Sequence, residues 1–188
     1  MKSWDVIVIG SGAAGFAAAV TACCKGLSVL MLEKAPQFGG TSAISGGAVW
    51  IHDSDQARTM TTDDSQQAIK TYLRTIIGEP NYRQDLIEAF ISSGREALAF
   101  LEKEGAVKYS LRPLSPDYYP DEPGAVDVGR ALEVVEFDGR KLGEYFRDLR
   151  SPPPGMLLFG GMMVNRVDIQ HFLDLRRSLR SITHCGKL

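Results

Sequence analysis

The fold is decided by residues 4–15, Trp4-Asp-Val-Ile-Val-Ile-Gly-Ser-Gly-Ala-Ala-Gly. Asp5 to Ile9 is almost wholly apolar, as expected for a strand that is buried on both faces of a parallel sheet. Gly10, Gly12 and Gly15 follow with G-x-G-x-x-G spacing, at the point where the strand has to become a helix. In this arrangement the first glycine makes the tight turn, the second lets a pyrophosphate approach the backbone, and the third lets the helix pack on the strand.

The residues that follow complete a strand-helix-strand unit. Ala13 to Lys25 is rich in alanine and ends at Gly26, so we expect a helix there, and Leu27 to Leu32 is the second apolar strand. Glu33 ends that strand about 20 residues after the last glycine, where a carboxylate can bind a ribose hydroxyl. The alternative is a glycine-rich turn without a ligand. Strand, glycines, helix, strand and acid in register favour a dinucleotide site, with phosphate at the start of the helix.

Length and composition restrict the class of protein. The 188 residues can bury one core, with or without a small appendage, and 44% hydrophobic and 23% charged residues are typical of globular proteins. A net charge of −2 without a basic stripe argues against a nucleic-acid partner. No apolar run reaches the roughly 20 residues that span a bilayer. The first strand begins by Asp5, which leaves no room for a signal peptide, so we expect a cytoplasmic protein.

Cysteine and histidine form no metal-binding pattern. Cys23 and Cys24 are adjacent on the expected first helix, so they point in different directions, and we expect them to be small buried hydrophobic side chains. His52, His171 and His184 are scattered, without the spacing of metal ligands. We predict no metal site.

A second glycine-rich segment runs from Ala35 to Trp50. Gly39-Gly and Gly46-Gly each lie beside small hydroxyl residues, so backbone donors can crowd around a flat or anionic group. A flexible surface loop is the alternative, but the apolar residues of the segment are unusual for an exposed linker.

These segments resemble the N-terminal FAD-binding region of the fumarate reductase and 3-ketosteroid dehydrogenase flavoprotein superfamily. The resemblance is carried by Gly10-Ser-Gly-Ala-Ala-Gly, Glu33-Lys34, Gly39-Gly-Thr-Ser and Ser45-Gly-Gly-Ala. In that family the second segment lies along the pyrophosphate and the isoalloxazine ring, so the resemblance implies FAD and not NAD. The implied cofactor contacts are Gly10, Ser11, Gly12, Ala14, Gly15, Glu33, Lys34, Gly40, Thr41, Ser42, Gly46 and Gly47.

From Thr61 the pattern changes to charged amphipathic helices. The first has acidic or hydroxyl residues at its start, Thr62, Asp63 and Asp64, and an apolar face of Ala68, Ile69, Tyr72, Leu73 and Ile76. Asn81 is expected to cap a second helix, Gly94 to mark a joint, and a third helix to stop at Gly105. We interpret these helices as packing elements of a capping region.

The remaining residues predict shorter elements. Val107 to Leu111 and Glu133 to Phe137 read as strands, the second turning at Asp138-Gly139, and Asp168 begins a last helix. Met156 to Val164 is apolar, and its Met162-Met163 pair is interpreted as core, with the lining of a substrate pocket as the alternative. The predicted fold is therefore α/β, with a Rossmann-like FAD-binding segment over residues 1–60. An inserted, mostly helical capping region follows over residues 61–188, and the sheet is expected to be incomplete.

A loop rich in proline and glycine carries two tyrosines. It contains Asp117-Tyr-Tyr-Pro-Asp-Glu-Pro-Gly and is followed by Gly129-Arg130. Tandem tyrosines in a rigid loop are more often packing residues than acids. The run is similar to the ketosteroid dehydrogenase branch, where a tyrosine of this region lies in the active site. The resemblance implies Tyr118 as the catalytic residue, with Tyr119 as the alternative.

The resemblance implies FAD-dependent dehydrogenation next to a ketone, with a steroid-like small molecule as substrate. Chains of the superfamily are considerably longer, and their remaining sheet strands and most catalytic residues lie beyond the part that this sequence resembles. Two alternatives stay open. One is a fumarate-reductase-like flavoprotein that transfers hydride in the reverse direction, and the other is a non-catalytic remnant that binds nucleotide weakly or works as half of a complex.

Overall fold

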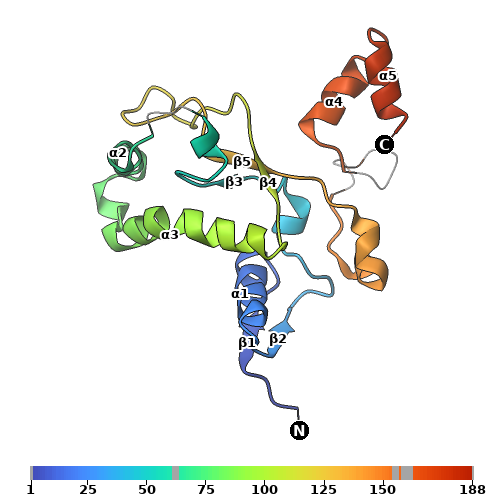
Figure 1. Ribbon diagram of the computed structural model, residues 1–188, viewed down its shortest axis with the longest axis horizontal. Helices are drawn as coiled ribbons and strands as arrows, with labels where there is room; N and C mark the ends of the chain where they lie inside the picture. Colours follow the sequence, from blue (N-terminus) through green and yellow to red (C-terminus); the bar gives the residue numbers. More distant parts are fainter. Residues whose placement is uncertain (1, 61–63, 154–156, 158–162, 188) are drawn as a thin grey trace.

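A computed structural model describes residues 2–60, 64–153, 157 and 163–187 (Figure 1). The chain begins with strand β1 (Val6–Ile9), helix α1 (Ala13–Cys24) and strand β2 (Val29–Leu32). β1 and β2 pair in parallel, with Val6 opposite Val29 and Ile9 opposite Leu32. The predicted strand-helix-strand start of an α/β fold is confirmed.

The central part of the molecule combines two helices with a small antiparallel sheet. The sheet has the strand order β3-β5-β4, from Val49–Trp50, Ala131–Val134 and Tyr109–Leu111. Helices α2 (Gln66–Ile77) and α3 (Gln84–Lys103) lie beside it in Figure 1. The core between these elements consists of Ile69, Tyr72, Leu73 and Ile91, with Trp50 packed against it.

Short helices connect and follow these elements. They are the 3₁₀ helices η1 (Ser42–Ile44), η2 (Ala57–Thr59), η3 (Glu79–Asn81) and η4 (Gly139–Asp148) and the α-helices α4 (Arg166–Leu173) and α5 (Leu179–Cys185). α4 and α5 form a hairpin that stands apart from the central part in Figure 1. Across the described ranges, every helix is too short or too polar to cross a bilayer.

The predicted start of α2 is wrong in detail. Ser65 caps the helix, because its side chain accepts a hydrogen bond of 3.1 Å from the Ala68 N–H. Asp64 binds buried Arg130 and is therefore not the cap, while Thr62 and Asp63 lie outside the described residues. On the predicted apolar face, Ile69, Tyr72 and Leu73 are buried. Ile76 is 37% exposed.

The predicted joint at Gly94 is also wrong. α3 is one 20-residue helix that runs through Gly94, and its N-cap residue is Arg83, because Asn81 belongs to η3. A Cβ added to Gly94 would lie 3.7 Å from the Ile51 side chain, so this part of α3 packs on the segment after β3. That tertiary contact explains why the glycine does not interrupt the helix.

The later elements differ from the predictions by a few residues. β4 lies within the predicted Val107 to Leu111 strand, whereas β5 begins earlier and ends at Val134. Asp138 then caps η4 by accepting from the Arg140 N–H at 3.1 Å. The single last helix is a pair, and the first of the two is capped by Asn165, with Asp168 completing a capping box. Most of the predicted core segment Met156 to Val164 lies outside the described residues.

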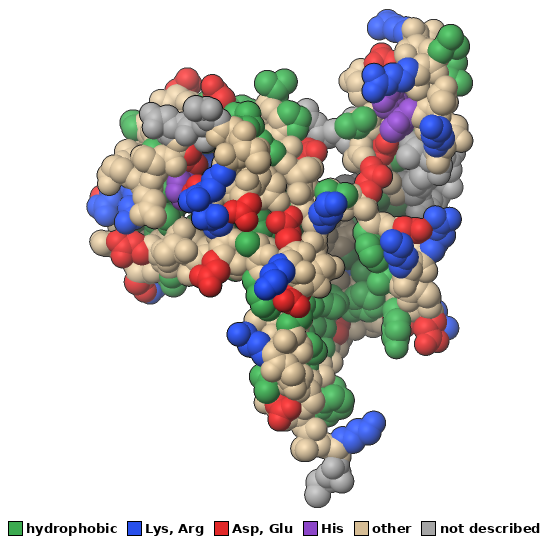
Figure 2. Space-filling model, viewed as in Figure 1, with side chains coloured by type: hydrophobic (Ala, Val, Ile, Leu, Met, Phe, Trp, Pro, Cys, Tyr) green, Lys and Arg blue, Asp and Glu red, His purple; other side chains and the backbone are tan. Residues whose placement is uncertain are grey.

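The prediction that Cys23 and Cys24 are buried is wrong. Both side chains are exposed at the C-terminal end of α1. Figure 2 shows hydrophobic side chains on the surface of this N-terminal unit as well. The boundary between residues 60 and 61 stays a prediction.

Candidate cofactor site and tyrosine loop

The turn between β1 and α1 depends on two of its glycines for its own geometry. Gly10 has a φ of 93°, which L side chains rarely adopt, and its N–H continues the strand ladder to the Leu32 carbonyl at 2.7 Å. A Cβ on Gly15 would lie 1.9 Å from the Gly10 carbonyl oxygen. Any larger residue at position 15 would therefore push α1 off β1.

Gly12 and Gly46 stand out because the protein's own packing does not require glycine there. Gly12 has an ordinary φ of −75° as the N-cap of α1. At both positions an added Cβ would meet nothing within 4 Å. Among the glycines in the described ranges, only these two combine open space with the absence of a left-handed φ. Open space at these two positions is what a cofactor against the backbone would need.

The two glycine segments lie against each other. The Gly39 N–H donates to the Ser11 hydroxyl oxygen at 2.9 Å, and the Ala13 N–H donates to the Ser42 hydroxyl oxygen at 3.1 Å. A Cβ on Gly40 would lie 3.1 Å from the Gly12 Cα. The structure therefore brings together two of the segments that the sequence assigned to one site.

Glu33 is tied to the same turn. Its Oε2 accepts from the Ser11 N–H at 2.9 Å and from the Ser11 hydroxyl at 2.5 Å, and its Oε1 accepts from the Ala35 N–H at 2.9 Å. The Ala35 N–H, followed by the two Ser11 donors, lowers the pKa of Glu33 to about 2. A carboxylate has about four acceptor positions, so Oε1 keeps capacity for a ligand hydroxyl.

The other predicted cofactor contacts lie outside the hydrogen-bonded group of Ser11, Glu33 and Gly39. Ala14, Lys34, Thr41 and Ser42 are exposed. Gly47 has a φ of 68° and packs beside Val134 of β5, which a Cβ would approach to 2.9 Å. Each of these cofactor contacts stays a prediction.

Tyr118 and Tyr119 lie on the loop that follows β4. Their side chains are 97% and 58% exposed. The loop lies beside α2 in Figure 1, apart from the α1 and β1 unit. Its Asp117 accepts a hydrogen bond of 2.8 Å from the indole N–H of Trp50, the last residue of the second glycine segment. The catalytic role of Tyr118 stays a prediction.

Two residues at the base of this loop received no role from the sequence. Asp117 is 5% exposed and Arg130 is 1% exposed, and they form an ion pair with Nη1 and Oδ2 2.7 Å apart. The signal was present in the sequence, because an acid opens the Pro-Gly run and an arginine follows it. Opposite charges at the two ends of a rigid loop can pair across its base.

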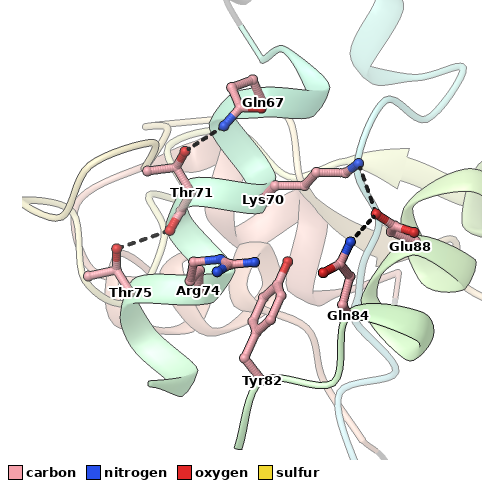
Figure 3. Close-up of a pocket in the computed structure, with 8 residues that line it drawn as sticks. All are labelled: Gln67, Lys70, Thr71, Arg74, Thr75, Tyr82, Gln84 and Glu88. Atoms are coloured by element: carbon pink, nitrogen blue, oxygen red, sulfur yellow. Dashed lines mark hydrogen bonds and ion pairs between the residues drawn. The ribbon is translucent and has the colours of Figure 1, made fainter. Parts of the chain in front are cut away.

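A separate hollow of about 350 Å³ lies between α2 and α3 (Figure 3). Its charged side chains are already paired. Lys70 lies 3.6 Å from Glu88, and Arg74 bonds to Glu79 at 3.0 Å while it stacks on the Tyr82 ring. The hollow between α2 and α3 is lined by none of the predicted cofactor or catalytic residues. In the described ranges, no three His, Cys, Asp or Glu side chains gather as a metal site.

Comparison with known proteins identifies the family. The family described as FAD binding domain matches residues 5–181. This chain belongs to that family. The 3-oxosteroid 1-dehydrogenase of Mycobacterium tuberculosis is 41% identical over 188 residues, which cover 100% of this chain and 33% of that protein. The 4-oxocyclohex-2-ene-1-carboxylate 5-dehydrogenase of Sinomonas cyclohexanicum is 36% identical over 183 residues, covering 97% of this chain and 30% of that protein.

A solved structure shows the same fold. The crystal structure of 3-ketosteroid delta1-dehydrogenase from Sterolibacterium denitrificans, in complex with 1,4-androstadiene-3,17-dione, superposes with a TM-score of 0.81 at 35% identity. The match covers 97% of this chain and 32% of that chain. The predicted family is confirmed, and the chain corresponds to the N-terminal part of its relatives. It spans about a third of their length.

Proposed function

We propose that this chain forms the flavin-binding part of an FAD-dependent dehydrogenase that acts next to the carbonyl of a ring ketone such as a 3-ketosteroid. The cofactor assignment rests mainly on Gly12 and Gly46, the glycines whose open space serves no packing of the chain. Membership of the FAD binding domain family supports it. The names of the two relatives, a 3-oxosteroid and a 4-oxocyclohexene-carboxylate dehydrogenase, support a ring ketone as substrate.

The described residues fit a dinucleotide in three ways. The N-terminus of α1, capped by Gly12, offers positive helix-dipole charge to a pyrophosphate, and no acidic residue lies in its first turn. Ionised Glu33 can accept a hydrogen bond from a ribose hydroxyl through Oε1. The segment from Gly40 to Gly47 would lie along the flavin side of the cofactor.

Bound FAD would accept the hydride that leaves the substrate. In this proposal Tyr118 assists removal of a proton from the carbon beside the carbonyl, or polarises that carbonyl by donating a hydrogen bond. Its exposed ring is free to face a substrate that other parts of the enzyme hold. The remaining catalytic groups would come from the two-thirds of the relatives' length that this chain does not match.

FAD binding tests the cofactor assignment. Gly12→Ala and Gly46→Ala should each raise the dissociation constant for FAD by about tenfold or more, because one misplaced contact of 1.4 kcal/mol has that effect. Neither Cβ atom meets a protein atom, so Gly46→Ala should keep the melting temperature of the unmodified protein. Gly12→Ala should lower it slightly, because alanine is a poorer N-cap residue than glycine. Gly94→Ala is the matched control and should leave FAD binding unchanged. Titration with flavin fluorescence measures this, and wild-type affinity in both variants would refute the assignment.

Turnover tests the reaction. The complete flavin-loaded enzyme that contains these residues should reduce an artificial dye with a 3-ketosteroid or with 4-oxocyclohex-2-ene-1-carboxylate as hydrogen donor. The 188 residues by themselves should not, because the remaining catalytic groups lie outside them in this proposal. Tyr118→Phe should lower the rate of the complete enzyme by about 10²–10⁴-fold. Reduction of fumarate by the reduced flavoprotein would favour the fumarate-reductase-like alternative. Flavin binding without turnover of any of the three compounds would favour the non-catalytic remnant.

A further inference from the structure

The loop that carries Tyr118 is closed at its base. Asp117 is buried, whereas residues 118–123 are all exposed. The Asp117 N–H donates to the Val126 carbonyl at 3.0 Å, and the Val126 N–H donates back to Asp117 Oδ2 at 3.1 Å. Tyr118 is therefore the first residue of a projecting loop whose two ends are held together.

One buried guanidinium binds three parts of the chain at this base. Arg130 Nη1 donates to Asp117 Oδ2 at 2.7 Å, and Nη2 donates to the Gly124 carbonyl at 2.9 Å. Nη2 and Nε also bind both oxygens of Asp64, at 2.5 and 3.1 Å. Arg130 thus joins Asp117, which precedes the loop, to Gly124 on its far side and to Asp64, which precedes the Ser65 cap of α2. Only the planar fork of an arginine can serve all three acceptors.

The surroundings of Arg130 hold this arrangement in place. The guanidinium lies 5.4 Å from the Trp50 ring centroid and 5.5 Å from that of Tyr72. The Trp50 indole N–H donates to Asp117 Oδ1 at 2.8 Å. Each buried charge is hydrogen-bonded, which a buried ion pair needs in order to be tolerated.

The residues on both sides of Tyr118 are fixed, although its own ring is not. Asp117 is held by Arg130, Trp50 and Val126, and the Tyr119 N–H donates to the buried Tyr72 hydroxyl at 3.3 Å. A ring that is 97% exposed makes little packing of its own. The direction of the Tyr118 side chain therefore depends on the backbone that these contacts hold.

We propose that Arg130 is a positioning residue, which clamps the tyrosine loop and thereby sets the direction in which Tyr118 projects toward substrate. The loop clamp stands on the contacts above, and its role in catalysis rests on the proposed function. A purely structural role is the competing explanation, because a buried arginine with three acceptors also stabilises the core.

Hydrogen exchange separates the clamp from general stability. Arg130→Lys keeps the charge but loses the fork, so exchange at the amides of Tyr119 and Val126 should accelerate by about tenfold or more, the effect of one charge-assisted hydrogen bond. Amides in the middle of α3 should keep their wild-type rates. Arg58→Lys is the matched control, because Arg58 also binds a carboxylate, that of Asp53, through two nitrogens but in an exposed pair. It should change neither region.

Equal acceleration in the loop and in α3 would overturn the proposal, and so would unchanged loop rates. If Arg130→Lys does not fold, Asp117→Asn should give the same local acceleration, because it removes the charge that Arg130 binds while keeping the side-chain size. Exchange needs neither flavin nor substrate, so it decides the clamp even if the proposed function fails.

Turnover measurements test whether Arg130 affects catalysis through Tyr118. In the complete flavin-loaded enzyme acting on a ring ketone, Arg130→Lys should lower kcat by about tenfold and change KM little, because the positioning of a reacting group affects the chemical step. The Tyr118→Phe/Arg130→Lys double variant should be no slower than Tyr118→Phe alone. A further, additive loss in the double variant would overturn an action through Tyr118.

Discussion

At the scale of single residues, Glu33 and Asp138 reach the same acidity by different means. The Ala35 N–H, then the hydroxyl and N–H of Ser11, lower the Glu33 pKa from 4.5 to about 2 without a cation. The Arg140 guanidinium lowers the Asp138 pKa to about 2 in an exposed pair. Salt screens exposed charge pairs but has little effect on hydrogen bonds from neutral donors.

Glu33→Gln should lower the melting temperature at neutral pH, because a neutral amide is a weaker acceptor and its NH₂ group opposes one of the donors. The folded-state pKa of Glu33 lies below its ordinary value, so the stability that ionised Glu33 contributes is complete above pH 4.5 and is lost as the pH falls to about 2. The difference in melting temperature between wild type and variant should therefore shrink as the pH falls from 4.5 to about 2. Thermal unfolding followed over this pH range measures it.

Asp138→Asn is the control for this experiment. Its effect at neutral pH should fade in high salt, whereas the effect of Glu33→Gln should persist, because only Asp138 depends on a cation. A Glu33→Gln effect that salt removes, or one that stays constant down to about pH 2, would contradict the assigned cause of the low pKa.

At the scale of elements, α3 shows how packing overrides a local pattern. Gly94 lies in the interior of the helix, and a Cβ there would make ordinary contacts with Ile51 at 3.7 Å and Phe90 at 4.0 Å. Gly94→Ala should therefore raise the free energy of unfolding by about 0.5–1 kcal/mol, through helix propensity and the restricted unfolded chain. Urea unfolding measures it.

Gly124→Ala is the opposite case and makes a matched pair with Gly94→Ala. Gly124 has a φ of 82°, and its Cβ would lie 2.1 Å from the Ala68 carbonyl oxygen of α2. The variant should lose stability by more than Gly94→Ala gains. Stabilisation at position 124, or destabilisation at position 94, would show that the loop and α3 pack differently from this structure.

The strand-helix-strand start could be predicted because its local signals agree. Apolar strands, a glycine turn and an alanine-rich helix all specify the same elements between Asp5 and Leu32. The cap of α2 could not be predicted, because Asp64 is bound by Arg130, which lies 66 residues away along the chain. The candidate site divides in the same way into a local part that the sequence predicts and a long-range part that it does not. Glycine spacing predicts where a cofactor lies, whereas the clamp between Asp117 and Arg130 exists only once the loop has folded back on β5.

At the scale of the whole molecule, the parallel sheet is covered on one side only. Val8 is 8% exposed and faces α1, whereas its neighbours Ile7 and Ile9 are 59% and 86% exposed on the other face. Ile9 pairs with Leu32, which is 47% exposed. Parallel sheets are normally covered on both faces. The other strands in the described ranges do not extend this sheet, because β3, β5 and β4 form a sheet of their own.

A polypeptide of these 188 residues, expressed by itself, should be marginally stable and aggregate through this face. Burying one large aliphatic side chain contributes roughly 1.5–3 kcal/mol. Leaving Ile7, Ile9 and Leu32 uncovered therefore loses burial free energy comparable with the whole net stability of a domain, about 5–15 kcal/mol. In the part of the chain that the structure describes, β1 and β2 pair only with each other, so both outer edges add a template for association.

Ile9→Glu should raise the soluble fraction of this polypeptide, because it places a charge on the uncovered face. Leu114→Glu is the matched control: Leu114 is 89% exposed on a loop, close to the 86% of Ile9, and its replacement should change solubility little. Light scattering and the soluble yield after expression measure both. Equal gains from the two variants would mean that overall charge, and not this face, governs association. A soluble monomer with a sharp cooperative melt in the unmodified chain would mean that the two-stranded sheet is stable with one face in water, against the pattern of its own apolar side chains.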